Sequence, residues 1–173
     1  GWQHGDSYTL PVAPSPNLKT PEAIRLYPSL CFFEATILSV GRGTPNPFTA
    51  LGYPNKELGE YLFTPKSMQG ATDAKHKGQR CYGTNYTDSL SQGGLSIAPL
   101  IDWQKRTQKV GKRLIDRERT FDLLAGSPSL RKQLREGWSE EAIRKSWQED
   151  LRKYRALRRQ YLIYKDNRPE TKP

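Results

Sequence analysis

The sequence predicts an α+β fold: a small mixed β-sheet of three to five strands in the first half, with helices from the second half packed on it. Two observations predict this fold. Short segments rich in aromatic and β-branched residues, separated by Gly- and Asn-bearing loops, fill the region from Leu30 to Tyr86. From about Ile97 onward, apolar residues recur instead with the period of a helix. The length of 173 residues fits one domain.

The chain should begin with an extended, proline-rich segment followed by a short helix. Thr20 and Pro21 form a typical N-cap and first helical position, and we expect this helix to run to about Leu26 and to end at Pro28. Residues 30–38 carry apolar side chains at both even and odd positions, which is typical of a strand buried on both faces. We therefore predict that this segment is a central strand.

Three more strands are expected at residues 48–53, 61–65 and 80–86. In the second half, Ser127-Pro128 should start a helix that Gly137 ends, and Ser139 should cap the next one. This last helical region carries one apolar stripe, formed by Ile143, Trp147, Leu151, Tyr154, Leu157 and Tyr161. Basic side chains occupy its opposite face.

The formal net charge of +10 is concentrated in the second half of the chain. Lys plus Arg against Asp plus Glu gives 8 minus 7 for residues 1–100 and 20 minus 11 for residues 101–173. Such an excess raises a nucleic-acid- or polyanion-binding module as an alternative function. The charges nevertheless fall opposite an apolar stripe, as they do on an ordinary solvated helix face, so we expect nucleic acid not to be the partner.

Few residues are suited to metal binding or to nucleophilic catalysis. The chain has two cysteines, Cys31 and Cys81, and two histidines, His4 and His76, in no metal-ligand spacing, so we expect no metal and no cofactor. A single disulfide and two buried thiols both remain open. No apolar run is long enough to span a membrane.

The segment from Glu34 to Thr44 is the best candidate for a binding site. Glu34 lies among apolar residues, where an unpaired charge is costly, and Arg42 is the nearest cation in sequence. One interpretation is an ion pair that shapes the turn. The other is that Gly41 and Gly43 let main-chain N–H groups approach a ligand while Arg42 binds a carboxylate or sugar oxygens.

Short motifs in register along nearly the whole chain point to a family. They are Leu10-Pro11-Val12, Pro14-Ser15-Pro16-Asn17, Tyr27-Pro28-Ser29-Leu30-Cys31, Phe33-Glu34, Gly41-Arg42-Gly43-Thr44, Phe63-Thr64-Pro65, Cys81-Tyr82-Gly83, Leu124-Ala125-Gly126-Ser127, Ser146-Trp147 and Tyr161-Leu162-Ile163-Tyr164. In these motifs the chain resembles the C-terminal half of the exo-β-N-acetylmuramidase (NamZ) family of glycoside hydrolases.

The resemblance implies a bacterial glycoside hydrolase that releases terminal N-acetylmuramic acid from peptidoglycan fragments and takes part in cell-wall recycling. It also implies that this enzyme is exported and acts in the periplasm or outside the cell. It implies a Rossmann-like N-terminal catalytic domain, which this chain lacks, and a C-terminal auxiliary domain at residues 8–165 that lines the substrate cleft between the two. Residues 1–7 would be a tag or linker remnant and 166–173 a polar tail. The expected partners are the catalytic domain and muramyl saccharides from peptidoglycan. No residue here would be catalytic. The candidate substrate-binding residues are Glu34, Thr36, Ser39, Gly41, Arg42, Gly43 and Thr44.

Overall fold

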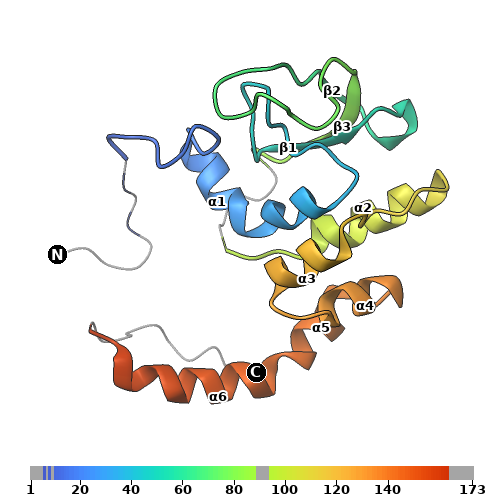
Figure 1. The fold of residues 1–173 in the computed structure, drawn as a ribbon. Helices are drawn as coiled ribbons and strands as arrows, with labels where there is room; N and C mark the ends of the chain where they lie inside the picture. Colours follow the sequence, from blue (N-terminus) through green and yellow to red (C-terminus); the bar gives the residue numbers. More distant parts are fainter. Residues whose placement is uncertain (1–5, 7, 9, 89–93, 164–173) are drawn as a thin grey trace.

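The computed structural model describes residues 6, 8, 10–88 and 94–163, and it confirms an α+β fold (Figure 1). The three strands are β1 (Ala50–Tyr53), β2 (Tyr61–Phe63) and β3 (Cys81–Asn85). The α-helices of the described residues are α1 (Pro21–Leu30), α2 (Ala98–Lys109), α3 (Glu118–Ala125), α4 (Ser129–Arg135), α5 (Glu140–Ser146) and α6 (Gln148–Arg158). Short 3-10 helices are η1 (Cys31–Ala35), η2 (Lys56–Leu58) and η3 (Arg159–Tyr161).

The three strands form one sheet in the order β1-β3-β2, within the predicted strand segments. Both pairings are antiparallel, so the sheet is not mixed as expected. Gly83 lies at its centre, opposite Gly52 of β1 and Tyr61 of β2. A Cβ atom on Gly83 would lie 1.8 Å from the carbonyl oxygen of Leu51, so the close approach of β1 to β3 requires glycine at this position.

The prediction of a central strand at residues 30–38 is wrong. The helix α1 continues past Pro28 to Leu30, and η1 follows it directly. Helical hydrogen bonding ends at Thr36, whose N–H donates to the carbonyl of Phe33 at 3.1 Å. Burial on all sides explains the misleading pattern, since Leu30 and Phe33 are fully buried but sit on helical turns. A short apolar run of this kind does not distinguish a strand from a buried helix.

After η1 the chain runs extended and connects the two halves of the fold. The N–H of Ile37 donates to the carbonyl of Leu114 at 2.9 Å, on the segment between α2 and α3. Ser39 and Gly52 exchange two main-chain hydrogen bonds of 2.8 and 3.1 Å, which attach the same segment to β1. Residues 36–40 therefore hold the sheet and the helices together, although they form no strand of the sheet.

The core lies between the sheet and the helices below it in Figure 1. Its largest fully buried side chains include Phe33, Trp103 and Phe121. The indole N–H of Trp103 donates to the hydroxyl of Tyr86 at 2.8 Å, which satisfies the one polar group of this buried side chain. Helix α3 packs on η1 and α4, and α4 packs on α2, so the predicted packing of the second half on the first is observed.

The predicted end of α4 at Gly137 and the predicted cap of α5 at Ser139 agree with the structure, whereas α4 begins at Ser129, one residue after the expected Pro128. Gly126 and Gly137 have φ values of +78° and +75° and follow α3 and α4 closely. The hydroxyl of Ser139 accepts a hydrogen bond of 3.1 Å from the N–H of Ala142 and caps α5. Within the described part of the chain, no helix has the length and apolar character needed to cross a bilayer. The predicted remnant at 1–7, apart from Asp6, and the polar tail at 166–173 lie outside the described residues.

Candidate functional site

A depression of about 690 Å³ lies beside the segment that follows η1. One wall is formed by this segment, and the other by the loop from Gly70 to Lys75, with Arg117 at the edge. Its volume is in the range of small-molecule sites, which usually measure about 300–1,000 Å³. Three of the predicted site residues, Glu34, Ser39 and Arg42, line it directly.

Arg42 is held in place by two contacts across the depression. Its Nη1 lies 3.1 Å from Oε1 of Glu34, so the ion pair that formed one of the two interpretations of the sequence is present. Its Nη2 donates to the carbonyl oxygen of Gly70 at 3.0 Å. The side chain of Arg42 is nevertheless 40% exposed and that of Glu34 29% exposed. The guanidinium is therefore oriented by the protein and still accessible from the depression.

The hydroxyl groups of the three predicted site residues Thr36, Ser39 and Thr44 bond the main chain nearby. Thr36 Oγ1 donates to the carbonyl of Phe33 at 2.7 Å, and Thr44 Oγ1 donates to that of Gly41 at 2.6 Å. Ser39 Oγ accepts a hydrogen bond of 3.3 Å from the N–H of Gly41. These local bonds fix the course of the loop that carries Arg42.

The backbone conformation of the loop requires glycine at positions 41 and 43. Their φ values of +74° and +81° lie in the region that favours glycine. A Cβ atom would lie 2.3 Å from the carbonyl oxygen of Asn46 at Gly41, and 2.5 Å from that of Lys66 at Gly43. The space beside both glycines is thus filled by neighbouring main chain. The tight loop presents Arg42, and the glycines make the loop possible.

Two cations of the depression were not predicted from sequence. Lys75 Nζ donates to the carbonyl of Thr36, and the guanidinium of Arg117 donates to the carbonyl of Glu34. Burial lowers the pKa of Lys75, partly opposed by the negative charges of Asp116 and Glu34. These residues lie 39 and 83 positions from their acceptors, so no local motif connects them to the Glu34–Thr44 segment.

The depression therefore combines three cations with two acids, Glu34 and Asp73. Guanidinium and ammonium groups bind carboxylates and sugar oxygens, and the arginine fork can do so with two parallel hydrogen bonds. Among the described residues, no three His, Cys, Asp or Glu side chains gather as metal ligands would. Such a site is suited to recognising an anionic or polar ligand.

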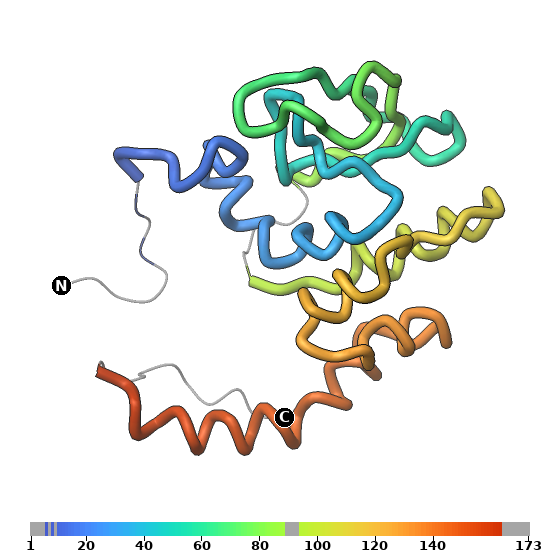
Figure 2. The backbone as a smooth tube through the Cα atoms, viewed as in Figure 1, coloured from blue at the N-terminus to red at the C-terminus, as the bar shows by residue number. Residues whose placement is uncertain are grey.

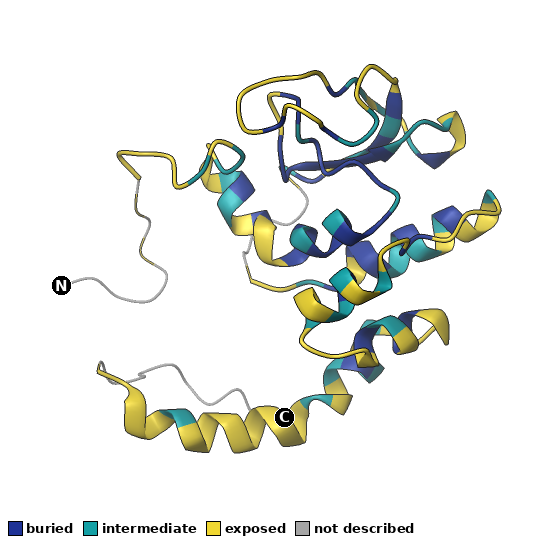
Figure 3. Ribbon diagram, viewed as in Figure 1, coloured by how far each residue is buried: buried dark blue, intermediate teal, exposed yellow. Residues whose placement is uncertain are grey.

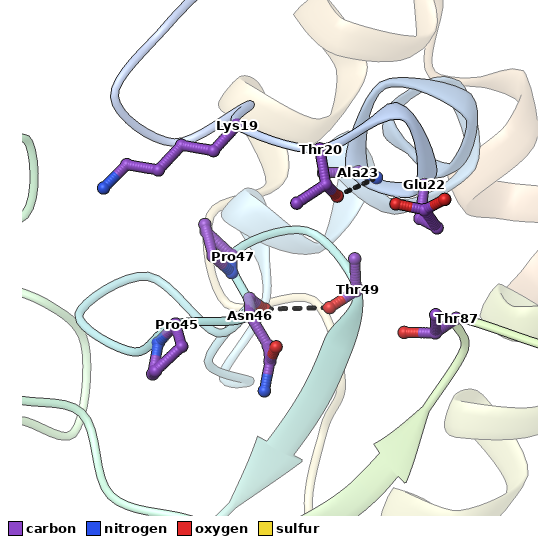
Figure 4. Close-up of a pocket in the computed structure, with 9 residues that line it drawn as sticks. All are labelled: Lys19, Thr20, Glu22, Ala23, Pro45, Asn46, Pro47, Thr49 and Thr87. Atoms are coloured by element: carbon purple, nitrogen blue, oxygen red, sulfur yellow. Dashed lines mark hydrogen bonds between the residues drawn. The ribbon is translucent and has the colours of Figure 1, made fainter. Parts of the chain in front are cut away.

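A second, smaller pocket of about 120 Å³ lies between the start of α1 and the loop before β1 (Figure 4). On one wall, Thr20 Oγ1 caps α1 by accepting a hydrogen bond from the N–H of Ala23. On the other wall, Thr49 Oγ1 donates to the carbonyl of Asn46 at 3.2 Å. Its volume is below that of usual ligand sites. The depression at Arg42 is the better candidate.

The two cysteines are free thiols, which answers the question that the sequence left open. Cys81 is fully buried, and burial raises its pKa to about 12. Burial also raises the pKa of Cys31, with a smaller contribution from the negative charge of Glu34. A protonated thiol is a poor nucleophile, so the raised pKa values of the buried Cys81 and the partly buried Cys31 do not favour a nucleophilic role.

Comparison with known proteins identifies relatives over almost the whole chain. The chain is 32% identical to the peptidoglycan β-N-acetylmuramidase NamZ of Bacillus subtilis (strain 168), over 92% of this chain and 42% of that protein. A crystal structure of a DUF1343 family protein from Bacteroides fragilis NCTC 9343 superposes with a TM-score of 0.83 at 36% identity, covering 96% of this chain and 47% of the other. A second such protein from the same organism shares the fold at 20% identity, with a TM-score of 0.65 over 89% and 45% of the two chains.

This chain thus spans less than half the length of these relatives. The profile of the family "Exo-beta-N-acetylmuramidase NamZ, C-terminal" matches residues 25–164, which include the Arg42 loop, the whole sheet and helix α6. The chain therefore belongs to the NamZ C-terminal domain family of peptidoglycan muramidases.

Proposed function

We propose that this chain is the C-terminal auxiliary domain of an exo-acting β-N-acetylmuramidase, which releases terminal N-acetylmuramic acid from peptidoglycan fragments. The domain lines the substrate cleft that it shares with an N-terminal catalytic domain. The observation that carries the proposal is Arg42, which is oriented by Glu34 and Gly70 and still exposed in a depression of about 690 Å³. The name of the Bacillus relative supports the substrate class.

The chemistry of the substrate fits this site. N-acetylmuramic acid differs from N-acetylglucosamine by a lactyl ether that ends in a carboxylate, so an enzyme that selects it benefits from a fixed cation. Arg42 supplies that cation, and Lys75 and Arg117 add positive charge beside it. Glu34 orients Arg42, while Thr36, Ser39, Gly41, Gly43 and Thr44 shape the loop.

The catalytic acid is assigned to the N-terminal domain and to no residue of this chain. Hydrolysis of a glycosidic bond usually requires two carboxyl groups on opposite sides of the bond. In the depression, Glu34 is engaged with Arg42, and no role as general acid is assigned to it. Because peptidoglycan lies outside the cytoplasmic membrane, the enzyme acts in the periplasm or outside the cell.

Turnover of a chromogenic N-acetylmuramic acid glycoside tests this division of roles. The full-length protein should release the chromophore, and the 173-residue chain alone should not. Turnover by the chain alone that a point change within it abolishes would contradict the proposal. Absence of turnover by the full-length protein on all muramyl substrates would also contradict it.

Polyanion binding is a second candidate, favoured by the net charge of +10. Many of the basic side chains of the second half are, however, already paired within the domain: Arg106 with Asp102, Arg131 with Asp122, Arg144 with Glu140, and Arg152 with Glu149. Duplex DNA binding measured at two salt concentrations separates the candidates, since phosphate-driven binding weakens steeply with salt. We expect no binding at physiological salt.

A further inference from the structure

Helix α6 is the part of the described chain that lacks a packing surface. None of its residues is buried, and its principal neighbours are α5 and η3, the elements directly before and after it in sequence. Figure 3 shows α6 as an almost wholly exposed helix that extends away from the body of the protein. By contrast, α5 contributes Ile143, which is fully buried in the core.

The exposed side chains of α6 and of η3, which follows it directly, include large apolar groups on one stripe. We define the α6 stripe as Leu151, Tyr154, Leu157 and Tyr161, which are 37, 60, 55 and 73% exposed. The apolar pattern expected from sequence is thus present, but only its first two members, Ile143 and Trp147, reach the core. Leu162 and Ile163, directly after η3, extend the apolar surface and are also exposed.

A helix of this kind needs a partner to be stable. It has 11 residues, and isolated helices shorter than about 12–15 residues are only marginally stable in water. The ion pairs of Glu149 with Arg152 and Lys153 lie at the surface and add little. Contiguous exposed apolar groups on a soluble domain typically mark an interaction surface.

We infer that the α6 stripe is the surface on which the domain preceding this one in the full-length protein docks. The inference rests on the two-domain parent of the proposed function, but not on its glycosidase activity. The family match extends to residue 164, so α6 belongs to the family domain and is not an appendage to it. That domain is the C-terminal one, and the relatives are more than twice as long as this chain. A preceding region of comparable size is thus available to cover the stripe.

The path of the chain supports the same occupant. In Figure 2 the N-terminal segment that leads into α1 and the helix α6 extend toward the same side of the body, with the other elements on the opposite side. A domain joined to the beginning of this chain would therefore start on the side toward which α6 extends. The segment of this chain before α1 also exposes apolar side chains, since Val12 is 77% and Leu10 43% exposed. These would add to the same interdomain contact.

Hydrogen exchange of the α6 amides tests the inference. We expect exchange at residues 149–158 to be at least about tenfold slower in the full-length protein than in the 173-residue chain, because docking must open before these amides exchange. In the full-length protein, Leu157→Glu should abolish most of this protection. The matched controls Arg152→Glu and Ala156→Glu, on the opposite face of the helix, should leave it in place. Since Leu157 is 55% exposed, the variant should keep its fold, which near-ultraviolet circular dichroism of the buried Trp103 would check.

Several results would overturn the inference. Equal exchange of α6 in the two proteins would do so, as would a loss of protection in the controls as large as in Leu157→Glu. Protection that rises with the concentration of the 173-residue chain, together with a dimeric mass in sedimentation, would assign the stripe to a second copy instead. A gene with no domain upstream of this chain would also refute it. Slow exchange in a full-length protein without muramidase turnover would refute only the proposed activity, whereas turnover with fast exchange would refute only the docking surface.

Discussion

Replacing Arg42 with Lys separates a structural role of this side chain from a role in ligand binding. The substitution keeps the positive charge but removes the planar fork that contacts Glu34 and Gly70 at the same time. The ion pair is partly exposed and should contribute about 0–1 kcal/mol. The hydrogen bond to the Gly70 carbonyl should contribute about 0.5–1.5 kcal/mol. Lysine can retain one of the two contacts, so we expect a loss of about 1 kcal/mol.

For a domain of this size, that loss corresponds to a fall of about 2–4 °C in the thermal unfolding midpoint. Circular dichroism of the 173-residue chain measures it, with Arg25→Lys as the matched control. Arg25 pairs with Glu22 on the exposed surface of α1, so its replacement should change the midpoint by less than about 1 °C. A midpoint for Arg42→Lys that equals that of the control would refute the energetic reasoning.

The same substitution in the full-length enzyme tests ligand recognition. If Arg42 binds the lactyl carboxylate, the preference for muramic over glucosamine glycosides, measured as the ratio of kcat/KM values, should fall about tenfold or more. This fall corresponds to about 1.4 kcal/mol or more. A lowered midpoint with an unchanged ratio would mean that Arg42 serves only to shape the turn, and would end the ligand hypothesis.

Two further predictions concern the sheet and the core. Gly83→Ala should unfold the chain or lower its midpoint by more than about 10 °C, because the added Cβ meets main-chain atoms of β1. Gly78→Ala, with φ of +78° but open space beside it, should cost only about 1 kcal/mol, and equal effects of the two would contradict the sheet geometry. Burial raises the pKa of both Cys81 and Tyr86 to about 12, from ordinary values of 9.0 and 10.0. Each group thus contributes stability that is full below its ordinary pKa and is lost as the pH rises toward 12, by about 1.4 kcal/mol per pH unit. The midpoint should fall above about pH 9 and fall less steeply in Cys81→Ala, and a midpoint constant from pH 8 to 11 would refute this.

The sequence predicts those parts of the fold that depend on local patterns. The strands β1, β2 and β3 lie within predicted segments because turn-forming residues bound each one. The C-terminal end of α4 follows from the backbone conformation of Gly137, and the start of α5 follows from the side-chain hydrogen bond of Ser139. Both act within one turn of the helix. These features need no knowledge of the rest of the molecule.

The errors occur where burial comes from distant parts of the chain. Residues 30–38 are surrounded by the sheet and by α3, so their apolar character reveals burial but not backbone conformation. The helix α1 also continues through Pro28, although proline removes a main-chain hydrogen bond and its ring crowds the preceding turn. Tertiary packing therefore decided the conformation in this segment.

The same distinction holds for the candidate site. Glu34 and Arg42 are 8 positions apart, and their pairing could be expected from the cost of a lone charge among apolar residues. Lys75 and Arg117 join them only because the fold brings three loops together. The sequence likewise indicates the apolar stripe of α6, but a pattern within one helix contains no information about its partner.

The proposal that this domain recognises muramic acid at Arg42 is tested most directly by titrating the isotope-labelled full-length protein with N-acetylmuramic acid and, separately, with N-acetylglucosamine. The side-chain Nε–H resonance of Arg42 and the amides of the Gly70–Lys75 loop report on the depression. We predict saturable shifts of these resonances with N-acetylmuramic acid, and much smaller ones with N-acetylglucosamine, which lacks the carboxylate. Identical responses to the two sugars, or shifts confined to other parts of the protein, would contradict the proposal.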